Sequence, residues 1–271
     1  MKVDLHLHTT FSDGSLTPEQ VVDTANSLNL RAIAITDHDT VDGIVPAIER
    51  AKIYRNFEVV PGIEINSFYC EEEVHILGYY IDYWSTTLRS ALKVMQKERI
   101  ERVKKIIEKL QKLGVEITFE EVEAKASGLS IGRPHIAMAL IEKKIVSSVE
   151  EAFQLYLGPG KPAYVPREKL SPYHAVDLIK KSGGITVLAH PGMLKNQVIV
   201  KSLIDYGVHG IEVYHKEHDE EKVKYFKNLA KKYGLLMTGG SDCHGKPLIM
   251  GSQPVPYKYV VQLKHFKNTN K

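Results

Sequence analysis

Cysteine is scarce in this chain: only Cys70 and Cys243 occur among its 271 residues, and they form no CxxC motif. The sequence therefore argues against a disulfide framework or a zinc site made of thiolates, and a reducing compartment fits this composition. Long apolar runs are absent too. The opening residues MKVDLHLHTT lack the apolar core of a signal peptide, and no segment approaches the length that spans a bilayer. We therefore expect a cytoplasmic protein without membrane contact.

A strong charge of one sign is also missing, because 36 Lys and Arg residues face 33 Asp and Glu residues and leave a formal net charge of +3. Such a balance does not predict general nucleic-acid binding, and Lys and Glu are interspersed as they are on solvated helix faces. With 43% hydrophobic residues, the chain can bury one large core, or one core with a small appended domain. No feature indicates an obligate protein partner.

Nitrogen and oxygen ligands for metal ions, in contrast, follow the apolar segments of the chain. In the opening segment Leu5 and Leu7 alternate with His6 and His8, and the period of two of a strand places both imidazoles on one face. The full set of candidate ligands is His6, His8, Asp13, His38, Glu64, His75, His190, Asp242 and His244. A single histidine is most often structural, but this ensemble predicts a metalloenzyme.

Strand and helix patterns alternate along most of the sequence. Apolar, β-branched stretches occupy residues 3–8, 32–36, 57–66, 74–81, 185–190, 210–214 and 235–239. Helical patterns follow most of them, and Thr17 with Pro18 marks the start of a helix that runs to about Asn29. This rhythm predicts a parallel α/β barrel with its site at the carboxyl ends of the strands. His75 is the exception, because it lies near the start of its segment, and one antiparallel strand would resolve the conflict.

The rhythm breaks between Thr86 and Pro162. A long amphipathic helix ending at Gly114, and shorter helical patterns at 118–126, 134–143 and 149–157, predict a helical insertion that caps the barrel mouth. One apolar face of the long helix is expected to pack on its neighbours rather than serve as a nucleic-acid arm. That face comprises Val94, Ile100, Val103, Ile106, Ile107 and Leu110. We expect the barrel to be formed by 1–85 and 163–271, and the insertion or cap domain by 86–162.

Several motifs resemble those of the polymerase and histidinol phosphatase (PHP) family of metal-dependent phosphoesterases in order and spacing: HLHTTFSDG, TDHDT, PGIEI, VHILGY, LAHPG and GSDCHG. The resemblance covers nearly the whole chain and implies an α/β fold, a distorted (β/α)7 barrel with three metal ions at its mouth. The insertion, with SIGRPHIAMALIEK and YLGPGKPAYVP, looks most like the subgroup that removes the 3′-phosphate from nucleoside 3′,5′-bisphosphates. Some members of that subgroup also trim short 5′-phosphorylated RNA.

The resemblance also implies a ligand set for each of three divalent ions. These sets are His6, His8, Glu64 and Asp242; Glu64 as a bridge with His75 and His190; and Asp13, His38 and His244. Imidazole and carboxylate ligands suit manganese, iron or zinc; we expect manganese and leave iron and zinc open. Coordination lowers the pKa of bound water toward about 7, so a hydroxide can attack phosphorus without a serine or cysteine nucleophile.

Three residues outside the barrel motifs are candidates for binding the substrate. Arg133 precedes Pro134 at a predicted helix N-terminus, where free N–H groups, the helix dipole and a guanidinium together favour a phosphate. His135 belongs to the same clamp. Pairing of Arg133 with Glu120 or Glu121 is the structural alternative. Lys161 is a weaker candidate, because its Gly-Pro-Gly-Lys-Pro turn is not a Walker loop.

Catalytic roles are expected for Glu64 and Asp242 within the metal site, and for His215, which follows the sixth strand and could protonate the leaving group. The predicted activity is hydrolysis of a small phosphorylated nucleotide with two terminal phosphates, or of short RNA. Two alternatives remain: a histidinol-phosphate phosphatase, and a non-catalytic PHP metal-binding module. The helical insertion argues against the first, and the complete ligand set argues against the second.

Overall fold

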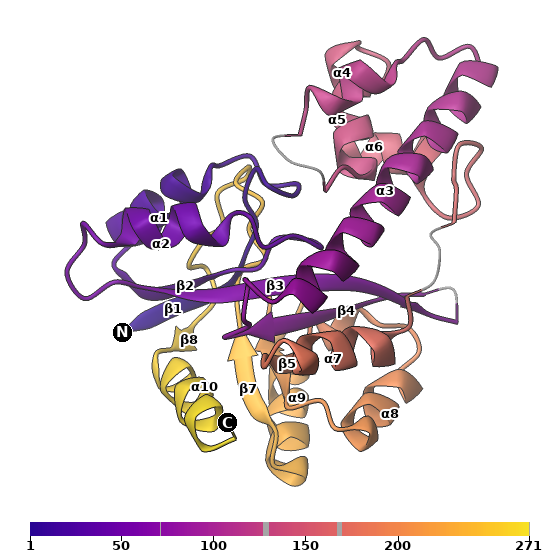
Figure 1. The fold of residues 1–271 in the computed structure, drawn as a ribbon. Coiled ribbons are helices and arrows are strands. Elements are labelled where there is room, and N and C mark those ends of the chain that lie inside the picture. Colours follow the sequence, from indigo (N-terminus) through magenta and orange to yellow (C-terminus); the bar gives the residue numbers. More distant parts are fainter. Residues whose placement is uncertain (71, 127–129, 167–169, 271) are drawn as a thin grey trace.

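A single curved sheet forms the centre of the molecule (Figure 1). The computed structural model describes residues 1–70, 72–126, 130–166 and 170–270. Its strands are β1 (Lys2–Leu7), β2 (Leu30–Ile35), β3 (Glu58–Tyr69), β4 (Glu72–Tyr79), β5 (Ile185–Leu188), β6 (Gly210–Tyr214), β7 (Leu236–Gly239) and β8 (Val255–Pro256). They follow the order β7-β6-β5-β4-β3-β2-β1-β8. A bridge between Leu7 and Cys243 brings the chain after β7 back to β1, so the sheet forms a nearly closed, distorted barrel, as predicted.

Strand β4 runs antiparallel to both of its neighbours, β3 and β5, whereas β1, β2 and β3, and β5, β6 and β7, run parallel. The start of an antiparallel strand lies beside the carboxyl ends of its neighbours. His75 therefore reaches the mouth of the barrel from the beginning of β4, where it pairs with Asn66 of β3. The antiparallel strand inferred from the position of His75 is confirmed.

Helices cover the outside of the sheet: α1 (Pro18–Ser27), α2 (Ile44–Ala51), α7 (Pro172–Lys181), α8 (Val198–Tyr206), α9 (Glu220–Tyr233) and α10 (Lys258–Thr269), with a 3₁₀ turn η2 (Pro191–Met193). Thr17 caps α1, because its side chain accepts a hydrogen bond from the N–H of Gln20. The strands are buried on both faces, and the side chains of Leu5, Leu7 and Ile33 are fully enclosed. Each such burial contributes about 1.5 to 3 kcal/mol to folding. Among the described residues, no helix has the length and apolarity needed to cross a membrane.

The segment between β4 and α7 is helical and projects from one side of the barrel (Figure 1). It contains α3 (Thr86–Lys112), α4 (Phe119–Glu123), α5 (Arg133–Glu142), α6 (Val149–Ala152) and a π-helical turn η1 (Phe153–Leu157). The first part of α3 packs into the barrel core through Leu88 and Leu92. Its second part belongs to a separate apolar cluster that includes Val103 and Ile106.

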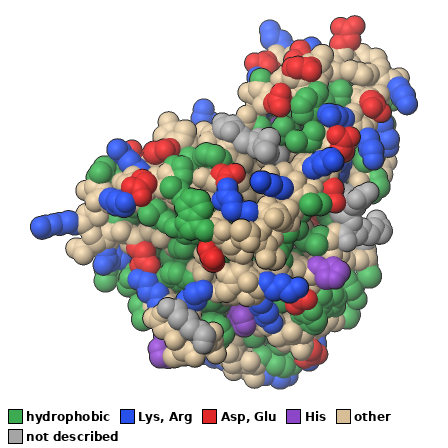
Figure 2. All heavy atoms as spheres, in the orientation of Figure 1, with side chains coloured by type: hydrophobic (Ala, Val, Ile, Leu, Met, Phe, Trp, Pro, Cys, Tyr) green, Lys and Arg blue, Asp and Glu red, His purple; other side chains and the backbone are tan. Residues whose placement is uncertain are grey.

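The predicted apolar face of α3 is correct except at Val94, which is 58% exposed. Val94 and Val103 are nine residues apart, and at 100° per residue this separation places them on opposite sides of the helix. The buried face instead continues from Val103 to Leu92 and Leu88 in the first half of α3. Acidic and basic side chains are interspersed over the face of the molecule shown in Figure 2, including the helical projection.

Candidate metal centre

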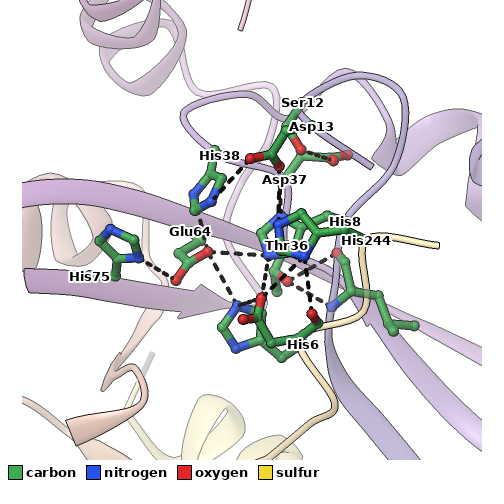
Figure 3. A network of polar contacts seen from close by, with 12 residues as sticks. His6, His8, Ser12, Asp13, Thr36, Asp37, His38, Glu64, His75 and His244 are labelled. Carbon is green, nitrogen blue, oxygen red and sulfur yellow. Dashed lines mark hydrogen bonds and ion pairs between the residues drawn. The ribbon is translucent and has the colours of Figure 1, made fainter. Parts of the chain in front are cut away.

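The predicted ligands converge at the carboxyl-terminal mouth of the barrel (Figure 3). His6 and His8 lie at and just after the end of β1, and their side chains are completely buried. Glu64 lies within β3 and is also buried. The loop after β7 carries Asp242 and His244, and the bridge from Leu7 to Cys243 holds that loop against β1. Residues that are far apart in sequence thus share one site because strands β1 and β7 meet.

Glu64 lies at the centre of this cluster, because each of its carboxylate oxygens faces a different group of imidazoles. Oε1 lies 2.9 Å from His75 Nδ1 and 3.1 Å from His190 Nε2. Oε2 lies 3.2 Å from His6 Nε2, 3.3 Å from His8 Nε2 and 3.1 Å from His38 Nδ1. This is the arrangement expected of a carboxylate that bridges two metal ions.

Among the described residues, three groups of donor atoms lie close enough to surround an ion. One comprises His6, His8, Glu64 and Asp242, another His38, Glu64 and His75, and a third His8, Asp13, His38 and His244. The first group is the same as the ligand set implied by the family resemblance. The third adds His8 to its predicted set, and the second contains His38 in place of His190. His190 nevertheless contacts the same oxygen of Glu64 as His75 does.

The chemistry of these side chains fits divalent metal ions. Several of their buried polar atoms have no hydrogen-bond partner within the described part of the chain: His6 Nε2, His8 Nδ1 and Nε2, Asp13 Oδ1, Glu64 Oε2, His75 Nε2 and His190 Nδ1. Leaving a buried polar atom unpaired costs about 1 to 3 kcal/mol. Metal coordination would satisfy these atoms, and imidazole with carboxylate is a donor set that transition metals favour.

In the absence of metal ions, the carboxylates and burial decide how the imidazoles are protonated. Burial tends to lower the pKa of His8, but Asp242 and Glu64 outweigh it and raise that pKa to about 10. For His38 burial prevails over Glu64 and Asp13 and lowers the pKa to about 3. Burial acts to raise the pKa of Glu64, yet the imidazoles around it hold that pKa well below its usual range. Metal binding would therefore displace a proton from His8.

Glu212 is a buried member of the site that the sequence analysis missed. Its Oε1 lies 3.0 Å from His6 Nδ1, and its Oε2 accepts a hydrogen bond of 2.7 Å from the backbone N–H of His190. A carboxylate on the far nitrogen of a metal-binding imidazole fixes the orientation and tautomer of the ring. The available signal was a charged residue in the middle of the apolar segment GIEVY, in the same pattern as Glu64 in PGIEI.

Backbone strain accumulates at the same place. His190 has a φ of 27° and Asp242 a φ of 51°, in the left-handed region that residues other than glycine rarely occupy. Conformations of this kind cost on the order of 1 to 3 kcal/mol and persist only when their surroundings hold them. The hydrogen bond from His190 N–H to Glu212 is one such restraint.

His215 is buried beside the cluster, and its Nε2 lies 3.4 Å from Asp242 Oδ2. Lys216, which the sequence analysis did not select, lies at the rim, with Nζ 3.1 Å from the same oxygen. Both residues follow β6 directly. The structure thus places a candidate proton donor and a cation next to Asp242.

Arg133 reaches the site from the start of α5, but its partner is neither Glu120 nor Glu121. Its Nη2 donates to Glu73 Oε1 of β4 at 2.6 Å, and its guanidinium lies 5.1 Å from the ring centre of Phe153. The suggested alternative pairing is therefore wrong. The sequence offers no signal for this contact, because Glu73 and Arg133 are brought together only when the insertion folds back over β4.

The other two substrate candidates occupy less direct positions. His135 is buried, and its Nδ1 accepts a hydrogen bond of 3.1 Å from the N–H of Gly132, so it holds the start of α5. Burial lowers the pKa of His135, which keeps the ring neutral. Lys161 is exposed in the turn after η1, and its N–H donates to the carbonyl of Gly158. Contacts of these two side chains with substrate stay a prediction.

The family model described as PHP domain matches residues 4–237. The chain belongs to the PHP family. It is 34% identical over 262 residues to the 5′-3′ exoribonuclease Rnm of Escherichia coli (strain K12), covering 94% of this chain and 86% of that protein. It is 33% identical over 248 residues to the 3′,5′-nucleoside bisphosphate phosphatase of Chromobacterium violaceum, covering 89% and 87% of the two chains.

Among solved structures, a protein from Bifidobacterium adolescentis described as a metal-dependent phosphoesterase matches with a TM-score of 0.89 at 30% identity, covering 96% of this chain and 94% of that one. The PHP fold and the ligand cluster at its mouth agree with this similarity. The protein is a PHP phosphoesterase, a hydrolase that depends on divalent metal ions.

Proposed function

We propose that this PHP phosphoesterase removes the 3′-phosphate from nucleoside 3′,5′-bisphosphates. The observation that carries the proposal is a cavity of about 200 Å³ with a metal-binding wall and an arginine wall. Its lining includes the predicted ligands Asp13, His38 and His75, which come from the barrel, and Arg99 and Arg133, which come from the insertion. A substrate with two phosphates meets both walls, with the reacting phosphate at the metal ligands and the other beside the guanidinium groups. The name of the bisphosphate phosphatase relative supports the same substrate.

The arginine wall belongs to the insertion, and we propose that residues 86–162 act as a cap domain over the barrel of 1–85 and 163–271. Arg99 of α3 donates to Asp39 Oδ2 at 2.8 and 2.6 Å, next to the predicted ligand His38. The Ser130 hydroxyl donates to the carbonyl of His38. These contacts fix the insertion to the loop after β2, so a phosphate held by the cap has a defined position relative to the metal ligands.

A second cavity, of about 590 Å³, adjoins the first and supports a nucleoside as the rest of the substrate. It shares His75 and Arg133 with the arginine-walled cavity, and its apolar lining includes Phe68, Phe153 and Tyr164. Rings of this kind bind the face of a nucleobase. Histidinol phosphate has only a small imidazole to offer this surface, which favours a nucleotide substrate over the histidinol-phosphate alternative.

We propose that the nine ligands hold three ions, with manganese expected and iron or zinc as alternatives, and that Glu64 bridges two of them. Divalent ions bound there supply charge neutralisation of phosphate oxygens and lower the pKa of water toward about 7. Asp242 and Glu64 supply negatively charged ligands to this site. We propose that His215, whose Nε2 lies 3.4 Å from Asp242 Oδ2, donates a proton to the leaving oxygen.

Short 5′-phosphorylated RNA is the second candidate substrate, and the similarity to the 5′-3′ exoribonuclease Rnm favours it. Both cavities beside the predicted metal ligands are open to the surface, so a nucleotide held there can extend into a chain. The deciding measurement is kcat/KM for adenosine 3′,5′-bisphosphate, adenosine 3′-monophosphate, histidinol phosphate and a 5′-phosphorylated oligoribonucleotide.

Arg133→Ala tests the arginine wall within this panel. We expect kcat/KM for the bisphosphate to fall about tenfold to a hundredfold, equivalent to roughly 1.5 to 3 kcal/mol for a charge-assisted contact. Turnover of the 3′-monophosphate should hardly change. Arg50→Ala is the matched control, because Arg50 also pairs with a carboxylate, Asp23, but on α1 and α2 away from the site. Equal losses for both substrates, or none, would contradict the proposed role of Arg133.

A further inference from the structure

A cavity of about 740 Å³ lies on the outside of the barrel, away from the predicted metal ligands. It lies over the start of β7, between helices α9 and α10, which are on either side of that strand in Figure 1. Its floor is apolar and partly aromatic, formed by Leu236, Met237, Tyr259 and Phe266.

The rim of this cavity carries several lysines. Lys227, Lys231 and Lys258 line it, and none of its described lining residues is Asp or Glu. Lys227 Nζ lies 4.6 Å from the ring centre of Tyr214, and Lys258 Nζ lies 5.3 Å from that of Tyr259. On the same helix α10, by contrast, Lys264 is neutralised by Glu58 at 2.7 Å. Positive charge is therefore concentrated over an apolar floor.

A second cavity, of about 460 Å³, continues the first toward the barrel mouth. The two share Tyr214, Lys227 and Lys231, and the second adds Lys224 together with one acid, Glu220. Lys224, Lys227 and Lys231 are spaced i, i+3 and i+7, so they lie along one face of α9. We call the two cavities together the α9–α10 groove.

The groove ends close to the metal centre. His218 lines its upper part, and the ring of His218 lies 5.5 Å from that of His215. His215 is in turn next to Asp242. Because both histidines are buried, their rings separate the upper end of the groove from Asp242.

We propose that the α9–α10 groove is a second binding site, which takes a nucleotide unit with its base on the apolar floor and its phosphate among the lysines. A simple anion would make no use of the floor, and an apolar ligand would leave the lysines unused. Stacking of a base on aromatic side chains and attraction of its phosphate by several cations are the two interactions that nucleotides combine. The volume of each of the two cavities lies within the usual range for small-molecule sites. The unit comes either from a free nucleotide or from an RNA chain, and the geometry of this groove does not depend on which bond the metal centre hydrolyses.

Lysine acetylation followed by mass spectrometry tests this site directly, on the purified full-length protein with its metal ions. The probes are adenosine 5′-monophosphate, a phosphorothioate oligoribonucleotide that resists trimming, inorganic phosphate and an acidic peptide. We expect the nucleotide probes to slow acetylation of Lys227, Lys231 and Lys258 at least threefold. Lys232, exposed on the same helix but outside the groove lining, is the control and should react at an unchanged rate.

Each pattern of protection has a meaning. Protection by both nucleotide probes supports a site for free nucleotide, and protection by the oligoribonucleotide alone supports a path for RNA. Equal protection by inorganic phosphate or by the acidic peptide would overturn the proposal, because the floor would then contribute nothing. If neither nucleotide probe protects the lysines, the proposal is overturned too.

A double variant provides an independent test. Lys227→Gln with Lys258→Gln should weaken binding of the protecting nucleotide at least fivefold, while turnover of adenosine 3′,5′-bisphosphate stays at the wild-type rate. The control, Lys232→Gln with Lys93→Gln, removes the same charge from exposed positions outside the groove. Equal binding by the two double variants contradicts the proposal. If the wild-type protein fails to hydrolyse the bisphosphate, the proposed function is wrong, but the protection pattern can still be interpreted.

Discussion

Glu212→Gln is the substitution that most directly tests how the metal centre is held in place. Glutamine has nearly the same shape as glutamate, but it replaces one acceptor oxygen with an N–H donor. Both groups facing Glu212 are donors or imidazole nitrogens: His6 Nδ1 at 3.0 Å and the backbone N–H of His190 at 2.7 Å. Glutamine can satisfy one of them and must present its amide N–H to the other. When His6 Nε2 binds a metal ion, Nδ1 carries the proton and cannot accept from the amide, so one contact is lost in a fully buried position.

The size of the effect follows from what those two contacts do. One orients a ring that faces Glu64 and Asp242, and the other restrains the strained backbone of His190. Loss of a supporting carboxylate of this kind typically weakens metal affinity or activity by about 10- to 100-fold, which corresponds to roughly 1.4 to 2.7 kcal/mol. Because Glu212 lies behind the imidazoles, we expect weaker metal binding to account for the loss, so that excess metal restores much of the activity.

The assay has two parts, metal content per chain after dialysis against a weak chelator, and turnover as a function of added manganese. Glu58→Gln is the matched control, because Glu58 is a partly exposed carboxylate of β3 paired with Lys264. Glu212→Asp keeps the charge but shortens the reach, and should give an intermediate result. Wild-type metal content together with wild-type activity in Glu212→Gln would refute the assigned role. A loss of activity that excess manganese does not change would show that Glu212 acts on something other than metal affinity.

Three further predictions concern the same site and the stability of the fold. Glu64→Gln should lower turnover more than a hundredfold and reduce metal content, because it removes charge from the carboxylate that both groups of imidazoles face. A variant with full metal content and normal rates would contradict the proposal that Glu64 bridges two metal ions. A strong chelator should abolish activity, and manganese should restore it better than magnesium, which prefers oxygen ligands and retains its waters; activity that persists in chelator would exclude metal dependence. Burial, reinforced by Lys180, lowers the pKa of His209 to about 4, below the value of about 6.5 in the unfolded chain. The unfolded state therefore binds more protons, and the free energy of unfolding should fall as the pH drops from 6.5 toward 4. His209→Gln should remove about 1 to 2 kcal/mol of that fall, a figure reduced for the partial exposure of the ring. The measurement is urea unfolding of the chelated protein at pH 7 and pH 4.5, with His174→Gln, at an exposed position, as the control. Identical pH dependence in the two variants would refute the assignment.

Local patterns in the sequence were sufficient for the α/β barrel and for selecting the candidate ligands that the structure brings together. Alternation of apolar and polar residues is a property of a few neighbouring residues, so it located the strands and placed His6 and His8 on one face. The rule that sites lie at the carboxyl ends of parallel strands then collected the remaining ligands, and the one violation, at His75, indicated the antiparallel strand β4. The periodicity was less reliable on α3, where Val94 follows the pattern of residue types but lies on the exposed side.

Tertiary structure alone decided how these residues are combined. The division of imidazoles between the two oxygens of Glu64 depends on how the sheet curls, and no spacing in the sequence encodes it. The same holds for Arg133, whose carboxylate partner Glu73 lies 60 residues away and becomes a neighbour only when the insertion folds over β4. Glu212 was overlooked because a lone carboxylate in an apolar strand gives no indication of which ring it faces. Secondary structure follows from short-range periodicity, whereas the pairing of side chains across a closed barrel is fixed by packing between distant segments.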